Sequence, residues 1–387
     1  MFKRNVLAVS MTLAALCSAQ AAMADINGGG ATLPQPLYQT SGVLTAGFAA
    51  YIGVGSGKGK LAFLNNDYSQ FGTGTKNVHW AGSDSKLSST ELSTYAANKQ
   101  AAWGKLIQVP SVATSVAIPF NMAGTNAVDL TVDQLCGVFS GRINTWNQLP
   151  ATGRTGNIVV VYRNEASGTT ELFTRFLAAK CVNESKKFVV TTNFADSFGV
   201  PAGAVPAVTS QGVMDALNAT TGGITYMSPD YAAPTLAGLD DATKVAKIGG
   251  VSPAPDNVST AIAAVPVPTA ANVANQNAWV PVFAAAADPA DPSVVAYPSS
   301  GYPILGFTNL IFSQCYADAT QTSQVRAFFT RHYGSSALNS NDNAIKANRF
   351  VPLPTAWKTA ITSNFVTATS ALSIGKSDVC NAIGRPL

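Results

Sequence analysis

A run of β-branched residues followed directly by a helical pattern constrains this fold more than any other feature of the sequence. The segment NIVVVYRN, residues 157–164, is almost continuously apolar, which is typical of a strand buried on both faces. TTELFTRFLAAKC follows after a short turn, and its apolar side chains recur at helical spacing. A buried strand, a turn and an amphipathic helix in direct succession indicate an α/β fold.

The same alternation of strands and helices continues along the chain. Three further strands and three further helices are predicted. The strands are at 106–120, just after the glycines at 222–223, and at 301–312, and the helices are near 212–218, 321–334 and 355–365. Residues 251–300 differ, because VSPAPDN, AVPVPTAAN and ADPADPSVVAYP are rich in Pro and Ala. We expect a surface excursion or linker there rather than core elements.

The N-terminal segment has the pattern of a secretory signal peptide over residues 1–24. Lys3 and Arg4 precede the apolar run VLAVSMTLAALCSA, and Ala-Met-Ala at 22–24 provides small residues for cleavage. Cys17 is disfavoured as a lipid anchor because Leu16 stands where a small residue is expected. No later run is long enough to predict a membrane span. We therefore expect an exported protein, either periplasmic or secreted further.

Charge and cysteine content fit export. Charged residues are 11% of the chain, against a usual quarter, and loss of Lys3 and Arg4 reduces the formal charge from +4 to +2. This balance does not suggest a nucleic-acid-binding surface. Once Cys17 is removed, an even set remains, which predicts two disulfides with three possible pairings. These cysteines are Cys136, Cys181, Cys315 and Cys380.

Metal and catalytic motifs are sparse. The chain has no C-x-x-C pair and only two histidines, His79 and His332, neither of which lies in a recognisable nucleophile motif. We expect no metal and no cofactor, and no catalytic residue is assigned.

The segment RNEASGTTELF, residues 163–173, is the best candidate for an anion site. The predicted strand ends at Arg163, and Ser167, Gly168 and Thr169 open the following helix. Unpaired N–H groups at a helix N-terminus, two hydroxyls and a guanidinium suit a tetrahedral oxyanion. The alternative interpretation is ordinary N-capping by a hydroxyl residue.

Two other segments offer single candidates. IGVGSGKGK, residues 52–60, resembles a nucleotide-binding P-loop but is one residue short and carries Gly59 where Ser or Thr is required. Its Ser56 can still donate to a small anion, unless the glycines only form a loop. In VHWAGSDSKL, residues 78–87, Asp84 is either an exposed helix cap or a carboxylate in a pocket.

The ordered set of these motifs resembles the DING proteins and, more broadly, the periplasmic phosphate-binding receptors of phosphate ABC transporters. The likeness extends over the mature chain, which begins DINGGG. It is carried by GGGATLP, GSGKG, GSDSKL, CGVFSGRINTWNQL, RNEASGTTELF and GGITYMSPDYA.

The resemblance implies a type II periplasmic-binding-protein fold of two lobes, each with a sheet flanked by helices. The two hinge crossings are expected near Phe120 and 297–302. Lobe 1 would comprise 25–119 and 298–387. Lobe 2 would comprise 120–297, including the Pro/Ala-rich insertion near 251–297. With these limits the pairing Cys136–Cys181 and Cys315–Cys380 keeps each disulfide within one lobe.

The resemblance also implies the site residues. Four lie in the first lobe and four in the second: Thr32, the backbone of Leu33, Ser56 and Asp84, then Arg163, Ser167, Gly168 and Thr169. Leu33 departs from the aromatic residue more usual after the Thr in these receptors. The glycines of GGGATLP are expected to form a turn that approaches the anion.

The implied function is exported, high-affinity binding of inorganic phosphate, HPO₄²⁻, for uptake or scavenging, with a phosphate ABC transporter permease as partner. An ionised Asp84 would accept a hydrogen bond from the P–OH group, which sulfate lacks at neutral pH. The alternative is a low-molecular-weight alkaline phosphatase, a description applied to some DING proteins, acting in the same cleft.

Overall fold

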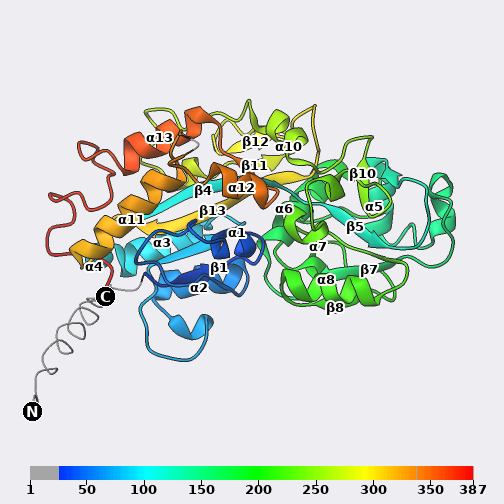
Figure 1. The fold of residues 1–387 in the computed structure, drawn as a ribbon, viewed down its shortest axis with the longest axis horizontal. Helices are drawn as coiled ribbons and strands as arrows, with labels where there is room; N and C mark the ends of the chain where they lie inside the picture. The colour runs from blue at the N-terminus through cyan, green and yellow to red at the C-terminus, as the bar shows by residue number, and fades with distance from the viewer. Residues whose placement is uncertain (1–25, 337, 387) are drawn as a thin grey trace, which may run out of the picture.

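Two six-stranded sheets divide the chain into two lobes, which lie side by side in Figure 1. The computed structural model describes residues 26–336 and 338–386. The signal peptide predicted at 1–24 lies outside these residues. Within the described residues, no helix is both long and apolar enough to cross a membrane.

The first lobe is built on a sheet with the strand order β14-β4-β13-β3-β1-β2. β1 is parallel to β2 and β3, whereas β13 is antiparallel to β3 and β4. The strands are β1 Gly28–Gly30, β2 Ile52–Gly53, β3 Trp80–Ser83, β4 Leu106–Ser115, β13 Leu305–Ser313 and β14 Val351–Pro352.

The second lobe is built on a sheet with the strand order β6-β10-β5-β9-β7-β8. β7 is parallel to β8 and β9. The strands are β5 Ile118–Asn121, β6 Asp129–Leu130, β7 Val159–Arg163, β8 Val205–Ala207, β9 Gly223–Ile224 and β10 Val245–Ile248. A separate parallel pair is formed by β11 Val282–Ala284 and β12 Val294–Ala296.

Helices flank both sheets. They are α1 Gln35–Gln39, α2 Ser56–Asn65, α3 Ser89–Asn98, α4 Gln100–Trp103, α5 Val132–Ser140, α6 Gly168–Lys180, α7 Phe194–Ser197, α8 Thr209–Ala219, α9 Pro229–Ala232, α10 Pro255–Ile262, α11 Ala319–His332, α12 Asp342–Ala347 and α13 Thr355–Phe365. The predicted α/β fold with two helix-flanked sheets is confirmed. β7 and α6 are the strand and helix predicted from NIVVVYRN and TTELFTRFLAAKC.

The first crossing between the lobes divides the apolar segment 106–120 into two strands in different sheets. β4 ends at Ser115 and β5 begins at Ile118. Val116 N–H donates to Ile304 in the first lobe, and Ala117 N–H donates to Met227 in the second. The crossing is therefore at 116–117, slightly before the expected Phe120.

The Pro/Ala-rich insertion packs mainly on the first lobe, which differs from the second-lobe placement expected for 251–297, although its strand β11 also contacts α6 of the second lobe. α10 contacts β4 and β14, and the buried Trp279 ring lies 4.7 Å from Phe365. The chain leaves the second sheet after β10, so it returns near 249–254 rather than 297–302. The reason is that the insertion contains core residues between its prolines, such as Val258 and Ile262 of α10.

The glycines at 28–30 form strand β1 rather than the expected turn. A Cβ on Gly28 would meet Trp80 Nε1 at 2.2 Å, and a Cβ on Gly29 would meet the Ile52 carbonyl at 2.3 Å. Glycine is required here because neighbouring groups on both sides of the strand approach its backbone too closely for a side chain.

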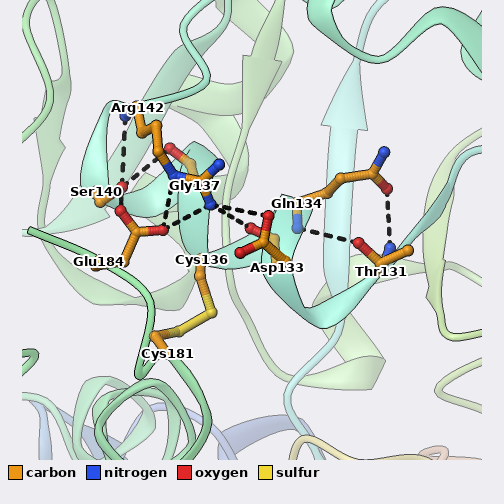
Figure 2. Close-up of a disulfide and its surroundings, with 9 residues drawn as sticks. All are labelled: Thr131, Asp133, Gln134, Cys136, Gly137, Ser140, Arg142, Cys181 and Glu184. Atoms are coloured by element: carbon orange, nitrogen blue, oxygen red, sulfur yellow. Dashed lines mark hydrogen bonds and ion pairs between the residues drawn. A yellow bond between two sulfur atoms is a disulfide. The ribbon is translucent and has the colours of Figure 1, made fainter.

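Both predicted disulfides are present, Cys136–Cys181 and Cys315–Cys380. Figure 2 shows the first, which ties α5 to the end of α6. Glu184, just after this bridge, accepts hydrogen bonds from Ser140 at 2.8 Å and from Arg142 at 2.8 Å and 3.0 Å. These bonds hold the same two helices together beside the disulfide.

Candidate functional site

The first-lobe half of the site lies at the carboxyl ends of the three parallel strands β1, β2 and β3. Thr32 and Leu33 follow β1, Ser56 opens α2 after β2, and Asp84 follows β3. Ligands commonly bind at this edge of an α/β sheet. Asp84 N–H donates to Ser56 Oγ at 3.1 Å, which joins the second and third of these segments.

The second-lobe half lies where β7 leads into α6. Arg163 is the last residue of β7. Ser167 caps α6, and its hydroxyl accepts a hydrogen bond from Thr170 N–H at 3.3 Å. Ser167 is therefore an N-cap, and its hydroxyl hydrogen remains available to donate. Gly168 and Thr169 form the first turn, where backbone N–H groups have no partner within the helix.

Hydrogen bonds across the cleft bring the two halves together. Thr169 Oγ1 donates to Asp84 Oδ2 at 3.3 Å, and Arg163 Nη1 donates to Thr32 Oγ1 at 3.2 Å. All eight predicted site residues thus lie in the two facing halves. Asp84 is not a helix cap, since α3 begins later and is capped by Ser88.

Gly168 of the second lobe lies very close to the first lobe. A Cβ at this position would lie 2.5 Å from Ser56 Oγ and 2.6 Å from Asp84 Cβ. Gly57 faces the second lobe almost as closely, because its Cβ would lie 2.8 Å from that of Ala166. Side chains at either glycine would hold the lobes apart.

The site is buried although its residues are polar. Each of the site residues Thr32, Ser56, Asp84, Arg163, Ser167 and Thr169 is at most 4% exposed. Among the described residues, Asp84 Oδ1 and Arg163 Nε have no hydrogen-bond partner. Buried polar atoms are normally paired, so these two atoms are available to a ligand that both accepts and donates. They are not unique, since other buried atoms in the described part of the chain, such as Ser228 Oγ and Tyr297 Oη, also have no partner.

Burial raises the pKa of Asp84 to about 6. The neighbouring Thr308 hydroxyl, the charge of Arg163 and the Thr169 hydroxyl oppose this shift, and the charge of Glu171 adds to it. The carboxyl group is therefore ionised above about pH 6 despite its burial.

Two site neighbours were missed from the sequence, Glu165 and Ser210. Glu165 Oε1 accepts from the Arg163 guanidinium and from Thr209 N–H at 2.7 Å. Ser210, in the first turn of α8, lies 2.9 Å from Thr32 through their hydroxyls. Glu165 lies two residues after Arg163 in the segment RNEASGTTELF, so an ion pair between them could have been predicted from the sequence. Ser210 carried no local signal, because only the fold brings α8 to the cleft.

The histidines lie away from the cleft, in the first lobe. Burial lowers the pKa of both His79 and His332 to about 4. His79 accepts from Asn27 N–H at 3.0 Å, and His332 bonds the Ser111 hydroxyl at 2.8 Å. Over residues 26–336 and 338–386, no cluster of His, Cys, Asp and Glu side chains could hold a metal ion.

Two α/β lobes that enclose a buried polar site are the architecture of a two-lobed binding protein. Comparison with known proteins places the chain in the same class. The family described as a PBP superfamily domain matches residues 18–328. A phosphate-binding protein from an unknown prokaryote is 66% identical over 94% of this chain and all of the relative. Alkaline phosphatase L of Pseudomonas aeruginosa strain UCBPP-PA14 is 67% identical over the full length of both.

Among solved structures, the periplasmic phosphate-binding protein PfluDING with bound phosphate is 70% identical. It matches 94% of this chain and all of its own, with a TM-score of 0.91. The chain belongs to the PBP superfamily and, within it, to the DING proteins.

Proposed function

We propose that this chain binds inorganic phosphate with high affinity, as HPO₄²⁻, in the cleft between its lobes. The observation that carries the proposal is the pair of unpartnered atoms, Arg163 Nε and Asp84 Oδ1, in a site closed on both sides. HPO₄²⁻ suits both, because its oxygens accept and its single P–OH donates. The phosphate-bound relative at 70% identity supports the same ligand.

In this proposal the first lobe supplies three neutral donors to the anion. They are the Thr32 hydroxyl, the Leu33 backbone N–H and the Ser56 hydroxyl. Thr32 and Ser56 are nearly fully buried, at 2% and 1% exposure. Their hydrogen bonds to an anion would be little weakened by water.

The second lobe supplies the remaining donors. The Arg163 guanidinium provides charge, and Ser167, Gly168 and Thr169 present the Ser167 hydroxyl and backbone N–H groups at the start of α6, while the Thr169 hydroxyl donates to Asp84. The positive end of this helix favours an anion. The anion would bind both lobes and so stabilise the closed form.

Asp84 is proposed to make the site selective. At neutral and alkaline pH its carboxylate accepts the proton of the P–OH group. Sulfate has no proton to offer, so its oxygen would face Asp84 Oδ1 without a hydrogen bond. Sites built around a required donor reject analogues that lack it by roughly 10⁴-fold.

We infer that the protein is exported, to the periplasm or beyond it, and that it delivers phosphate to an ABC transporter permease. The predicted signal peptide at 1–24, the two disulfides and the family support this role. A permease would distinguish the closed, loaded form from the open one by the relative position of the lobes.

Hydrolysis of phosphate esters is the second candidate, because a full-length relative carries the name alkaline phosphatase L. The same donors could stabilise a transferring phosphoryl group, with Asp84 as proton acceptor. Burial opposes this function, since Asp84 and Thr169 are 4% and 2% exposed and leave little room for an ester's leaving group.

One paired experiment tests both candidates. Phosphate is titrated calorimetrically into phosphate-free native and Asp84→Asn protein, and hydrolysis of p-nitrophenyl phosphate is assayed in the same preparations. We expect saturable binding at one site in the native protein, and any trace hydrolysis to be equal in both. Absence of binding would refute the proposal. Hydrolysis that disappears with D84N would establish the enzyme instead.

A further inference from the structure

Three polar groups of the second lobe lie within hydrogen-bonding distance of the Thr32 hydroxyl. Arg163 Nη1 lies at 3.2 Å, Ser210 N–H at 3.3 Å and Ser210 Oγ at 2.9 Å. Both Thr32 and Ser210 are buried, at 2% and 3% exposure. These bonds all cross the cleft, so they are made only when the lobes are closed.

The donor roles in this group can be assigned. A hydroxyl oxygen has two lone pairs and one hydrogen. The N–H groups of Arg163 and Ser210 can only donate, so they occupy both lone pairs of Thr32 Oγ1. In this arrangement the Thr32 O–H must therefore donate to Ser210 Oγ. When an anion takes up both the Arg163 guanidinium and the Thr32 O–H, Ser210 N–H and Ser210 O–H become the two donors to Thr32 Oγ1.

The backbone around Ser210 is held in an unusual conformation. Thr209 has φ of +59°, which is rare for a β-branched residue and strained. Its N–H is fixed by Glu165 Oε1 at 2.7 Å, and Glu165 also binds the Arg163 guanidinium. The Glu165 carboxylate thus binds Arg163, which contacts Thr32, and the backbone N–H of Thr209, which precedes Ser210.

We propose that Ser210 is a positioning residue for anion binding, which orients the Thr32 hydroxyl as a donor and stabilises the closed lobes. The inference rests on the proposed phosphate function. It assigns to α8 a part in the site that the β7–α6 motif does not include. Ser210 acts through Thr32, so its contribution must depend on the Thr32 hydroxyl.

A double-mutant cycle with phosphate tests this dependence. Ser210→Ala removes the 2.9 Å bond and is expected to raise the Kd for phosphate about three- to tenfold, mainly through faster dissociation. In a T32V background the same substitution should change the Kd less than twofold. Ser210→Thr should restore most of the affinity.

Ser197→Ala is the matched control. Ser197 is also a buried second-lobe serine, but its hydroxyl bonds Val189 in its own lobe at 2.7 Å. This variant should leave the Kd unchanged. An unchanged Kd for S210A, or an equal rise in Kd in the native and T32V backgrounds, would overturn this inference and leave the proposed function untouched. Failure of the native protein to bind phosphate would instead overturn the proposed function.

Discussion

The Thr169 hydroxyl and the Asp84 carboxylate meet across the cleft, with Thr169 Oγ1 donating to Asp84 Oδ2 at 3.3 Å. The two residues belong to different lobes, so this bond is present only in the closed protein. It occupies one carboxylate oxygen and leaves Oδ1 for a ligand. A carboxylate in an anion site is unusual, because it repels the ligand unless the ligand brings a proton.

Asp84→Asn is expected to weaken phosphate binding at least tenfold, since hydrogen bonds to charged groups contribute about 1.5–3 kcal/mol. The new amide can donate to sulfate, so the ratio of sulfate Kd to phosphate Kd should fall by more than tenfold. Calorimetric titration of both anions measures this ratio. An unchanged ratio would show that selectivity arises elsewhere.

Gly168→Ala is expected to reduce phosphate affinity at least tenfold, because its methyl group would lie 2.5 Å from Ser56 Oγ when the lobes are closed. Gly212→Ala is the control. This glycine also lies in a second-lobe helix, but its Cβ would meet nothing closer than 3.6 Å. Equal affinities for the two variants, measured by titration, would contradict the close approach described above.

Gly28→Ala tests the role of the glycine strand. We expect a loss of about 1–3 kcal/mol in the free energy of unfolding, because the new methyl group collides with the buried Trp80 ring. Urea denaturation of the phosphate-free protein measures this loss. If the glycines formed a loose tail or turn, stability would not change.

Asp230→Asn should make stability less sensitive to pH. Asp230 is buried in α9, where burial raises the pKa to about 7, partly offset by the charge of Arg349. The folded protein therefore binds a proton that the unfolded chain releases near pH 3.8. This contribution favours folding at low pH and is lost as the pH rises through about 7.

The measurement is the difference in Tm between D230N and the native protein at several pH values. The difference should grow in favour of D230N from about pH 4 to 7 and then level off. The histidines and Asp84 titrate equally in both proteins, so the difference isolates Asp230. A difference independent of pH would show that Asp230 is not protonated in the folded protein.

The local elements and the site were largely predictable from sequence. NIVVVYRN and the helix after it each carry a complete local pattern, and the structure forms them as β7 and α6. The eight site residues were placed by an ordered set of family motifs, and the structure brings their segments to one cleft. Those motifs are local, with each proposed site residue near the end of a strand.

The errors came from interactions between distant segments. GGG has the composition of a turn or tail, but it lies between β2 and β3 because neighbouring groups exclude any side chain there. Proline and alanine suggested a linker at 251–300, yet Val258 and Trp279 bury this segment against the first lobe. Ser210 reaches Thr32 only through the fold.

Competition between phosphate and sulfate for the native protein tests the central claim most directly. The phosphate-free protein is titrated with each anion at pH 8, where Asp84 is ionised and phosphate is mainly HPO₄²⁻. We predict saturation of one site by phosphate and a sulfate Kd at least about 10³-fold higher. Similar Kd values for the two anions would contradict the account, because a hydrogen bond from the P–OH group to Asp84 would then not determine selectivity.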